Sequence, residues 1–223
     1  MAKLNLYLVR HGQTYFNIYN KLQGWSNSPL TAKGKENAVH AGEMLQKVHF
    51  AAAFCSDTTR AQETISKILE LNQADSVKEA VYSPFFREEF YGVFEGTNMD
   101  LAWNMAGLPH GYSSFKEIVK AHSIGVAKDY LHDADPFHQA ENNEMYWQRV
   151  NKGLALIKHA DLHDGDNVLW VTHGNTLLSL AERFGHGKYD VTERPANGSL
   201  TKLSMDGDQV EIVAYNQTEL PAD

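Results

Sequence analysis

Cysteine and clustered positive charge are both scarce in this chain of 223 residues. Cys55 is the single cysteine, so no disulfide can form within the chain. Because Cys55 ends the apolar run 50–55, we expect a buried structural thiol rather than a nucleophile. The net charge is −8, and no basic block is present. Nucleic-acid surfaces need clustered Lys and Arg, so we expect no nucleic-acid partner.

Long hydrophobic runs are missing as well. No segment reaches the roughly 20 apolar residues that cross a membrane, and residues 4–9 are too short and too alternating for a signal peptide. We therefore expect a cytoplasmic protein without a membrane partner. A composition of 43% hydrophobic and 22% charged residues is typical of a globular protein. The length predicts a single domain, 1–223, that can bury a substantial core.

Apolar runs and helical periodicities alternate through most of the chain. Strands are predicted at 4–9, 50–55, 77–82 and 168–172, with helices after Thr31, after Ser56 or Asp57, at 145–158 and after residue 173. The stretch 15–29 has no periodicity and is predicted to be a loop. Asp206-Gly207, between the runs 200–205 and 210–215, indicates a hairpin. This order predicts an α/β fold, a three-layer sandwich with a mainly parallel sheet flanked by helices.

Residues 97–143 interrupt this alternation. They contain no clean strand, and aromatic side chains are scattered among histidines and polar residues. We predict a mostly helical insertion that forms a cap over the active site, and we call it the cap segment.

Two histidine–glycine pairs each follow an apolar run that predicts a buried strand. The first is LYLVRHGQT at 6–14, and the second is VLWVTHGNT at 168–176. Residues just beyond the carboxyl ends of strands line the ligand crevice of an open α/β sheet. The sequence therefore predicts one pocket that receives two imidazoles, His11 and His173, together with Arg10. Such a pocket suits an oxyanion, and one imidazole could attack phosphorus.

Phosphoryl transfer without a metal needs a nucleophile, cations for the phosphoryl oxygens and an acid for the leaving oxygen. His11 suits the first role, and Arg10 offers a planar donor fork for phosphate. Gly12 would let the backbone approach a ligand closely. The alternative for these residues alone is a chance Arg-His-Gly in a loop.

Two further side chains are predicted at the same end of the sheet. His173 precedes Gly174, whose helix would present free N–H groups to an anion; the alternative is a histidine that only caps that helix. Arg60 falls in the first turn of the helix after the second strand. Its alternative is a solvated surface arginine.

Glu88 and Glu89 are the candidate acids. They lie among five aromatic residues in 85–96, so at least one carboxyl is expected to be partly buried. Desolvation raises the pKa of a carboxyl group, as a general acid requires. The alternatives are an ion pair with Arg87 or a solvated edge, and spacing alone does not choose between the two glutamates.

Together these segments resemble the histidine phosphatase superfamily, also called the phosphoglycerate mutase-like family. The resemblance covers the whole chain apart from the variable insertion. The segments that carry it, in the family's order and approximate spacing, are LVRHGQT at 8–14 with Asn17, QGW at 23–25 with SPLT at 28–31, SDTTRAQET at 56–64, RE at 87–88 with Gly92 and EG at 95–96, and VTHG at 171–174.

The resemblance implies a role for each matching residue. His11 would become a phosphohistidine, and Arg10, Arg60 and His173 would complete the phosphate pocket. Asn17 would help to hold the phosphoryl group, while Gln23 and Gly24 would face the leaving part of the substrate. Glu88 takes the proton donor position, and Glu89 replaces an apolar residue that is usual there. Which carboxylate serves as the acid is therefore open. The implied substrate-binding set is Arg10, Gly12, Asn17, Gln23, Gly24, Arg60 and Gly174.

Mutases of this kind carry a basic segment after the acid glutamate and further arginines in the cap. This chain has Glu89-Phe90-Tyr91-Gly92 there, and its cap segment contains three lysines and no arginine. We therefore predict a metal-independent phosphomonoester hydrolase that acts on small phosphorylated metabolites, such as sugar phosphates or phenolic phosphates. The alternatives are a cofactor-dependent phosphoglycerate mutase and a non-catalytic phosphate-binding domain.

The 11 histidines raise the alternative of a metal hydrolase. However, the chain contains no His-Glu-x-x-His and no tight cluster of carboxylates and histidines. We expect no metal and no other cofactor, and we interpret His110, His122, His132 and His138 as polar residues of the cap segment. The sequence leaves a homodimer open.

Overall fold

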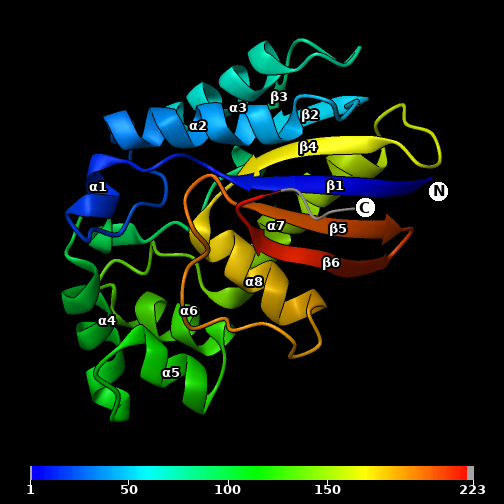
Figure 1. Ribbon diagram of the computed structural model, residues 1–223. Helices are drawn as coiled ribbons and strands as arrows, with labels where there is room; N and C mark the ends of the chain where they lie inside the picture. The colour runs from blue at the N-terminus through cyan, green and yellow to red at the C-terminus, as the bar shows by residue number, and fades with distance from the viewer. Residues whose placement is uncertain (1, 220–223) are drawn as a thin grey trace.

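The computed structural model describes residues 2–219, whose centre is a six-stranded sheet in the order β3-β2-β4-β1-β5-β6 (Figure 1). The strands are β1 (Lys3–Arg10), β2 (Ala52–Cys55), β3 (Val81–Tyr82), β4 (Asn167–Thr172), β5 (Leu200–Asp206) and β6 (Gln209–Gln217). The first four run parallel, while β5 and β6 are antiparallel to their neighbours. The predicted mainly parallel sheet is confirmed.

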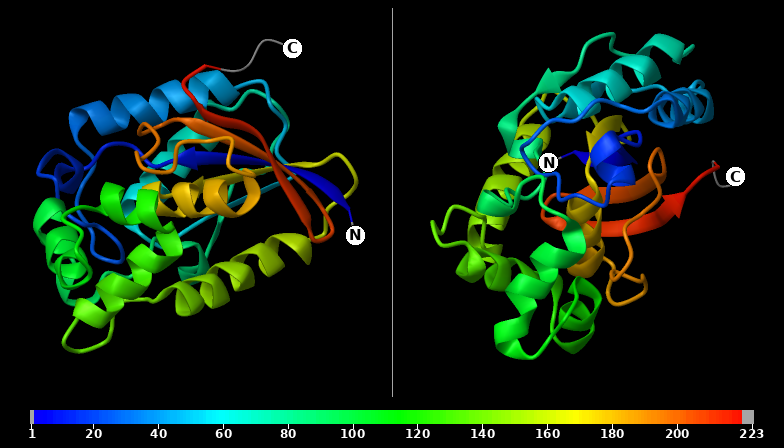
Figure 2. Two further views of the ribbon diagram at one scale, coloured as in Figure 1. Left: turned by 90° about the horizontal axis from the view of Figure 1, so that it is seen from below. Right: turned by 90° about the vertical axis from the view of Figure 1, so that its left-hand side faces the viewer.

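Helices cover both faces of this sheet (Figures 1 and 2). On one face, α2 (Ala32–Leu45) and α3 (Thr59–Leu71) pack against Tyr7, Val9 and Leu169. On the other, α7 (Asn143–Lys158) and α8 (Gly174–Phe184) pack against Leu8 and Trp170. Alternate residues of one buried strand point to opposite faces. The predicted three-layer sandwich is therefore confirmed.

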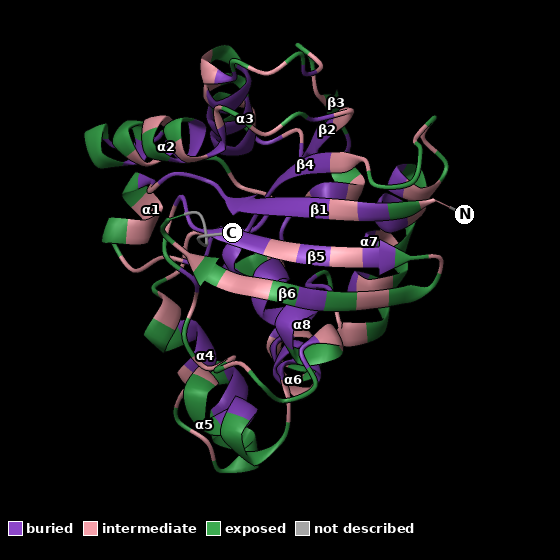
Figure 3. Ribbon diagram, turned by 45° about the vertical axis from the view of Figure 1, so that its right-hand side comes forward, coloured by how far each residue is buried: buried purple, intermediate pink, exposed green. Residues whose placement is uncertain are grey.

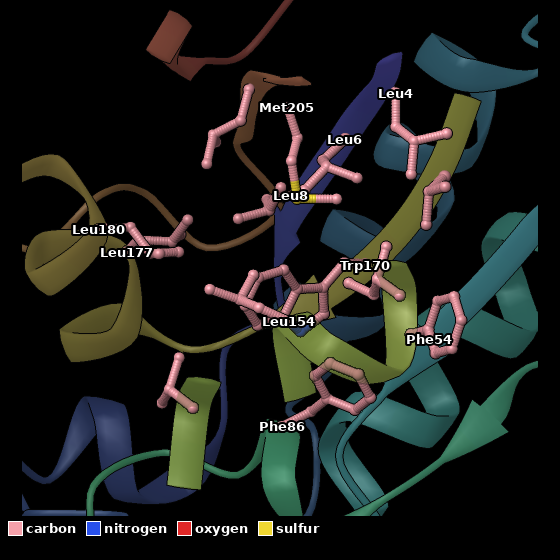
Figure 4. Close-up of a cluster of buried hydrophobic side chains, with 14 of the residues drawn as sticks. Leu4, Leu6, Leu8, Phe54, Phe86, Leu154, Trp170, Leu177, Leu180 and Met205 are labelled. Atoms are coloured by element: carbon pink, nitrogen blue, oxygen red, sulfur yellow. The ribbon is translucent and has the colours of Figure 1, made fainter. Parts of the chain in front are cut away.

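Trp170 lies in the middle of the larger core. Figure 4 shows its ring between Leu8, Leu154 of α7 and Phe86, with the Trp170 and Phe86 ring centroids 5.4 Å apart. Phe86 ends the short 3-10 helix η1 (Pro84–Phe86), two residues before Glu88. Core packing therefore anchors the segment that carries Glu88.

The cap segment contains α4 (Met99–Gly107), η3 (Leu108–His110), α5 (Phe115–Ala121) and α6 (Ile124–Ala134). These helices have their own apolar core around Trp103, Ile118 and Leu131, to which Tyr91 contributes. Figures 1 and 2 show them beside α1 (Tyr15–Ile18), at the end of the sheet where β1 and β4 finish. The 3-10 helix η2 (Gly92–Phe94) comes just before α4 in the chain. That this segment is a cap over the active site stays a prediction.

Local predictions differ from the structure at three points. The supposed loop 15–29 contains the four-residue helix α1, which is capped by Thr14 and is too short to show a periodicity. The third strand spans two exposed residues, Val81–Tyr82, instead of six. The N-cap residue of α3 is Thr58, because the Ser56 hydroxyl faces His173 at 2.9 Å and Asp57 pairs with Arg87.

Two other predictions are confirmed. Cys55 is buried, and β5 and β6 form the hairpin around Asp206-Gly207. Within residues 2–219, no helix combines the length and the apolar character needed to cross a membrane.

Burial along β1 leads to a stability prediction. Figure 3 shows its carboxyl half buried, in contrast to the largely exposed edge strand β6. Leu8→Ala should lower the free energy of unfolding by about 3 kcal/mol, through lost apolar contacts and the cavity left behind. Urea denaturation measures this loss. The matched variant Val213→Ala changes a residue that is 59% exposed and should cost less than about 1 kcal/mol. Equal losses would contradict the packing described here.

Candidate active site

The sheet register brings the two histidines together. Arg10 of β1 pairs with Thr172 of β4, so His11 and His173 each follow a strand end at the same level. Their ring centroids are 5.2 Å apart, and both side chains are buried. The predicted meeting of two imidazoles and Arg10 at one sheet edge is what the structure contains.

The hydrogen bonds of His11 define its tautomer. Nδ1 lies 2.8 Å from the Gly12 carbonyl oxygen, which only accepts, so Nδ1 carries the proton. Nε2 accepts from Arg60 Nε at 3.3 Å and keeps its lone pair. Burial lowers the pKa of His11 well below its usual value, and Arg60 and Arg10 lower it further. At neutral pH the ring is therefore neutral and has a nucleophilic Nε2.

Arg60 is fully buried, so the surface-arginine alternative is wrong. Its Nη2 donates to the Gly24 carbonyl at 2.7 Å and to His173 Nδ1 at 3.2 Å, while Nη1 donates to the Ser26 carbonyl at 3.0 Å. The helix α3 places this guanidinium between the two imidazoles. Burial lowers the pKa of Arg60 to about 10, which still leaves it charged at neutral pH.

His173 has the opposite tautomer to His11. Because Nδ1 accepts from Arg60, the proton lies on Nε2, which donates to Ser56 Oγ at 2.9 Å. His173 is the N-cap residue of α8, but its ring makes no capping hydrogen bond there and contacts Arg60 and Ser56 instead, so it does more than cap the helix. Burial, followed by Arg60, lowers its pKa well below the usual value. This imidazole is also neutral.

Arg10, which precedes His11 in the chain, is also buried. Its Nη1 donates to the Pro195 carbonyl, and its Nε is buried without a hydrogen-bond partner within the described residues 2–219. Burial, and then the nearby Arg194, lower its pKa to about 10. Gly174 lies against this side chain, since an added Cβ would meet Arg10 Nε at 3.2 Å.

Gly12 is needed for a different reason from the one predicted. A Cβ at Gly12 would meet the Gly34 carbonyl oxygen at 2.2 Å, and one at Gly34 would meet the Gln13 carbonyl oxygen at 2.0 Å. The close approach at Gly12 is thus to the backbone of α2 rather than to a ligand. Helix α2 and the His11 loop pack backbone to backbone at these two glycines.

Glu88 and Glu89 have different surroundings. Glu88 lines the pocket, and its carboxylate accepts from the Asn175 N–H at 2.7 Å and the Thr176 hydroxyl at 2.9 Å. Both donors belong to the first turn of α8, whose dipole favours a negative charge. Glu89 is fully buried beside the Asn175 side chain. The ion-pair alternative is wrong, because Arg87 binds Asp57 at 2.5 Å.

A cavity of about 230 Å³ lies over His11. Its wall consists of Arg10, His11, Gln13, Asn17, Lys21, Leu22, Gln23, Glu88, Tyr91, Met99, Gly174, Arg194 and Asn197. Among the predicted residues, Asn17 accepts from the Thr14 N–H at 3.0 Å, and Gln23 Oε1 accepts from the Thr14 hydroxyl at 2.6 Å. Gly12, Arg60 and His173 are not part of this wall but contact His11, which is. Gly24 is also outside the wall and lies against Tyr91, because an added Cβ would meet that ring at 3.0 Å.

Lys21, Arg194 and Asn197 were missed by sequence reasoning. Arg194 and Asn197 lie in the irregular segment 185–199, which has no periodicity to mark it. Asn197 Nδ2 donates to the His11 carbonyl at 2.9 Å. Lys21 and Arg194 both lie outside 97–143, so the scarcity of cations in the cap segment does not describe the pocket.

The cap histidines have packing partners. The His110 ring stacks on Tyr130 with centroids 3.6 Å apart, and His122 Nε2 lies 2.8 Å from the Tyr112 hydroxyl. Across residues 2–219, no group of three or more His, Cys, Asp or Glu side chains is arranged to hold a metal ion. Metal independence stays a prediction.

Comparison with known proteins agrees with this geometry. The sequence profile described as histidine phosphatase superfamily (branch 1) matches residues 6–218. The chain belongs to the histidine phosphatase superfamily, as its motifs predicted.

Its relatives include enzymes of two kinds. It is 41% identical over 194 residues to a 2,3-bisphosphoglycerate-dependent phosphoglycerate mutase 2 from Gloeobacter violaceus, covering 81% of this chain and 75% of the relative. It is 28% identical over 158 residues to a broad-specificity phosphatase from Saccharomyces cerevisiae, covering 70% and 65%. The crystal structure of phosphoglycerate mutase from Bacillus anthracis superposes with a TM-score of 0.86 at 32% identity, covering 97% and 94%.

The lowered pKa of His11 predicts a pH dependence of stability. Below about pH 6.5 the unfolded chain protonates this histidine and the folded protein does not, so stability is lost as the pH falls. His11→Asn removes this contribution of about 1.4 kcal/mol per pH unit. In urea denaturation between pH 7.5 and 5, the variant should gain stability relative to the wild type as the pH falls. Parallel curves would mean that His11 protonates equally in both states.

Proposed function

We propose that this protein is a metal-independent phosphomonoesterase that acts on small phosphorylated metabolites through a phosphohistidine. One observation carries the proposal: a neutral His11, whose unprotonated Nε2 accepts from buried Arg60, lines the same cavity as Arg10 and Glu88. The nucleophile, one cation and the acid thus line one small pocket, and a second cation contacts the nucleophile from outside its wall.

The chemistry follows from these positions. Arg10 and Arg60 bind the phosphoryl oxygens, and as Arg60 Nε turns to one of them it releases the His11 Nε2 lone pair, which attacks phosphorus. The substrate binds as a phosphate monoanion and passes its proton to the Glu88 carboxylate. The P–N bond forms as the P–O bond to the leaving group breaks, and Glu88 gives this proton to the leaving oxygen. The resulting Glu88 carboxylate then takes a proton from water, whose oxygen attacks the phosphohistidine. Cleavage of the P–N bond releases phosphate and restores His11.

The nucleophile can be tested directly. His11→Ala should reduce hydrolysis of p-nitrophenyl phosphate by more than about 1,000-fold, since no group remains to form the covalent intermediate. Circular dichroism should show an unchanged fold. Wild-type activity should be complete in EDTA. Near-wild-type turnover by the variant would overturn the assignment, and loss of activity in EDTA that a divalent ion restores would favour a metal hydrolase.

Phosphoglycerate mutase is a second candidate, favoured by Lys21 and Arg194. The missing cap arginines argued against a doubly charged substrate, but these two cations line the cavity from outside the cap segment. The side chain of Arg194 is near enough to Arg10 to lower its pKa, and it contacts Met99 on the cavity wall. Both cations could bind a second acidic group of the substrate. The mutase relatives support the same candidate.

Two measurements separate hydrolysis from transfer. Phosphate release from 3-phosphoglycerate without added 2,3-bisphosphoglycerate indicates a phosphatase, whereas isomerisation that requires this primer indicates a mutase. Arg194→Met should raise the KM for 3-phosphoglycerate about 10- to 100-fold, because it removes a charged hydrogen bond. The KM for phenyl phosphate, which has no second acid, should change little. Equal changes for both substrates would remove Arg194 from substrate selection.

A further inference from the structure

Glu89 is a buried acid that the proposed reaction does not use. Its side chain is fully buried. Asn175 contacts both glutamates: its backbone N–H donates to Glu88 Oε2 at 2.7 Å, and its side-chain Nδ2 donates to Glu89 Oε2. The residue that holds the Glu88 carboxylate is therefore itself held by Glu89.

The contact between Glu89 and Asn175 leaves one oxygen of each side chain without a hydrogen bond within the described residues. Glu89 Oε1 and Asn175 Oδ1 are both buried, and neither has a hydrogen-bond partner within the described part of the chain. Both are acceptors if Glu89 is ionised, so neither can satisfy the other. A single proton on Oε1 would convert it into a donor for Oδ1. That proton would satisfy both orphaned atoms at once, in a ring of two hydrogen bonds.

Burial favours the neutral form of Glu89 and raises its pKa to about 8, against the opposing charge of Lys128. Glu88 and Glu141 raise this pKa further, and Arg194 lowers it. The charged and titratable groups that face it are Glu88 and Tyr91 from its own segment, Lys128 from α6, Glu141 from the turn before α7, and Arg194 from the segment before β5.

Lys128 is the strongest opposite charge acting on Glu89, but its own contacts are with Ser179 and Tyr146. Its Nζ donates to Ser179 Oγ at 2.8 Å and lies 4.4 Å from the centroid of the Tyr146 ring. The Ser179 hydroxyl in turn donates to the Asn175 carbonyl at 2.8 Å. The hydrogen bonds of Lys128 therefore reach α8, while Glu89 has the Asn175 side chain.

We propose that Glu89 is a neutral carboxylic acid, paired with the Asn175 carboxamide by two hydrogen bonds, and that it is a positioning residue for Glu88. Asn175 Nδ2–H donates to Glu89 Oε2, and Glu89 Oε1–H donates to Asn175 Oδ1. The pair holds the first turn of α8 so that the Asn175 N–H points at Glu88. The positioning role rests on the proposed function, whereas the pairing does not.

Glu89→Gln and Glu89→Leu are matched tests. Glutamine can form the same two hydrogen bonds and does not titrate, whereas leucine has a similar size and forms neither. Wild-type Glu89 has a raised pKa, so its contribution to stability is present below about pH 4.5 and is lost as the pH rises to about 8. The thermal unfolding temperature (Tm) of Glu89→Gln should therefore exceed that of the wild type. The difference in Tm should grow by about 4 °C per pH unit between pH 5 and 8.

This unfolding experiment decides the pairing without any activity. If Glu89 is instead a carboxylate that pairs with Lys128, Glu89→Gln should be less stable than wild type, and the margin should not grow with pH. That outcome would overturn the proposal. Glu89→Leu, which leaves both Asn175 side-chain atoms unsatisfied, should be less stable than Glu89→Gln at every pH.

The positioning role is read from the pH profile of kcat. Wild-type kcat should fall as the pH passes 8, and Glu89→Gln should lose this break and keep its turnover. Glu89→Leu should lower kcat about 10-fold with KM little changed. Glu88→Gln is the comparator, since it should slow alkyl phosphates more than p-nitrophenyl phosphate at every pH.

Each outcome has a separate meaning. An unchanged alkaline break in Glu89→Gln would overturn the positioning role, even where the unfolding data support the pair. A wild-type protein that turns over no phosphate ester would overturn the proposed function, and the unfolding margin would still decide the pairing.

Discussion

The pocket depends on two guanidinium groups that are buried beside neutral partners. Arg60 donates to three backbone carbonyls and to both imidazoles, and Arg10 donates to the Pro195 carbonyl. Burial of a charge is costly unless it is compensated, and here it lowers the pKa of both arginines to about 10. Burial, together with these two charges, keeps the histidines neutral. Within residues 2–219 no carboxylate hydrogen-bonds to either guanidinium, so a phosphoryl group would supply the anionic partner, and the pocket is organised for it in advance.

The sheet is what keeps these arginines in place. Parallel pairing of β1 and β4 brings both histidines to one edge, and α3 starts at that edge with Arg60 in its first turn. The core around Trp170 and Phe86 anchors the segment that follows, so Glu88 approaches from a rigid element. Much of the apolar core therefore supports a few polar contacts at one end of the sheet.

Sequence reasoning found the parts of the site that follow a period or a strand end. His11, His173 and Arg60 could be placed because strand and helix boundaries locate them. Lys21, Arg194 and Asn197 could not, since they lie in irregular segments that only tertiary contacts bring to the pocket.

Dependence on tertiary contacts also explains why the N-cap residue of α3 was mispredicted and why the sequence did not choose between Glu88 and Glu89. Ser56 and Asp57 are reasonable N-cap residues, but His173 and Arg87 bind them across the fold. Glu88 and Glu89 are adjacent in an irregular segment, so no pattern tells which one enters the pocket. The answer depends on Asn175, which is more than 80 residues away and contacts both carboxyl groups.

The two glycines between the His11 loop and α2 extend the active site beyond its visible wall. Gly34 lies on α2 and is absent from the cavity lining, yet its carbonyl would lie 2.2 Å from any Cβ at Gly12. The absence of a side chain at Gly12 and at Gly34 therefore allows α2 and the His11 loop to lie this close together. A methyl group at either position would displace the backbone that presents His11. The depth of the nucleophile in its pocket is thus controlled from the outer helical layer, by a residue that a substrate never meets.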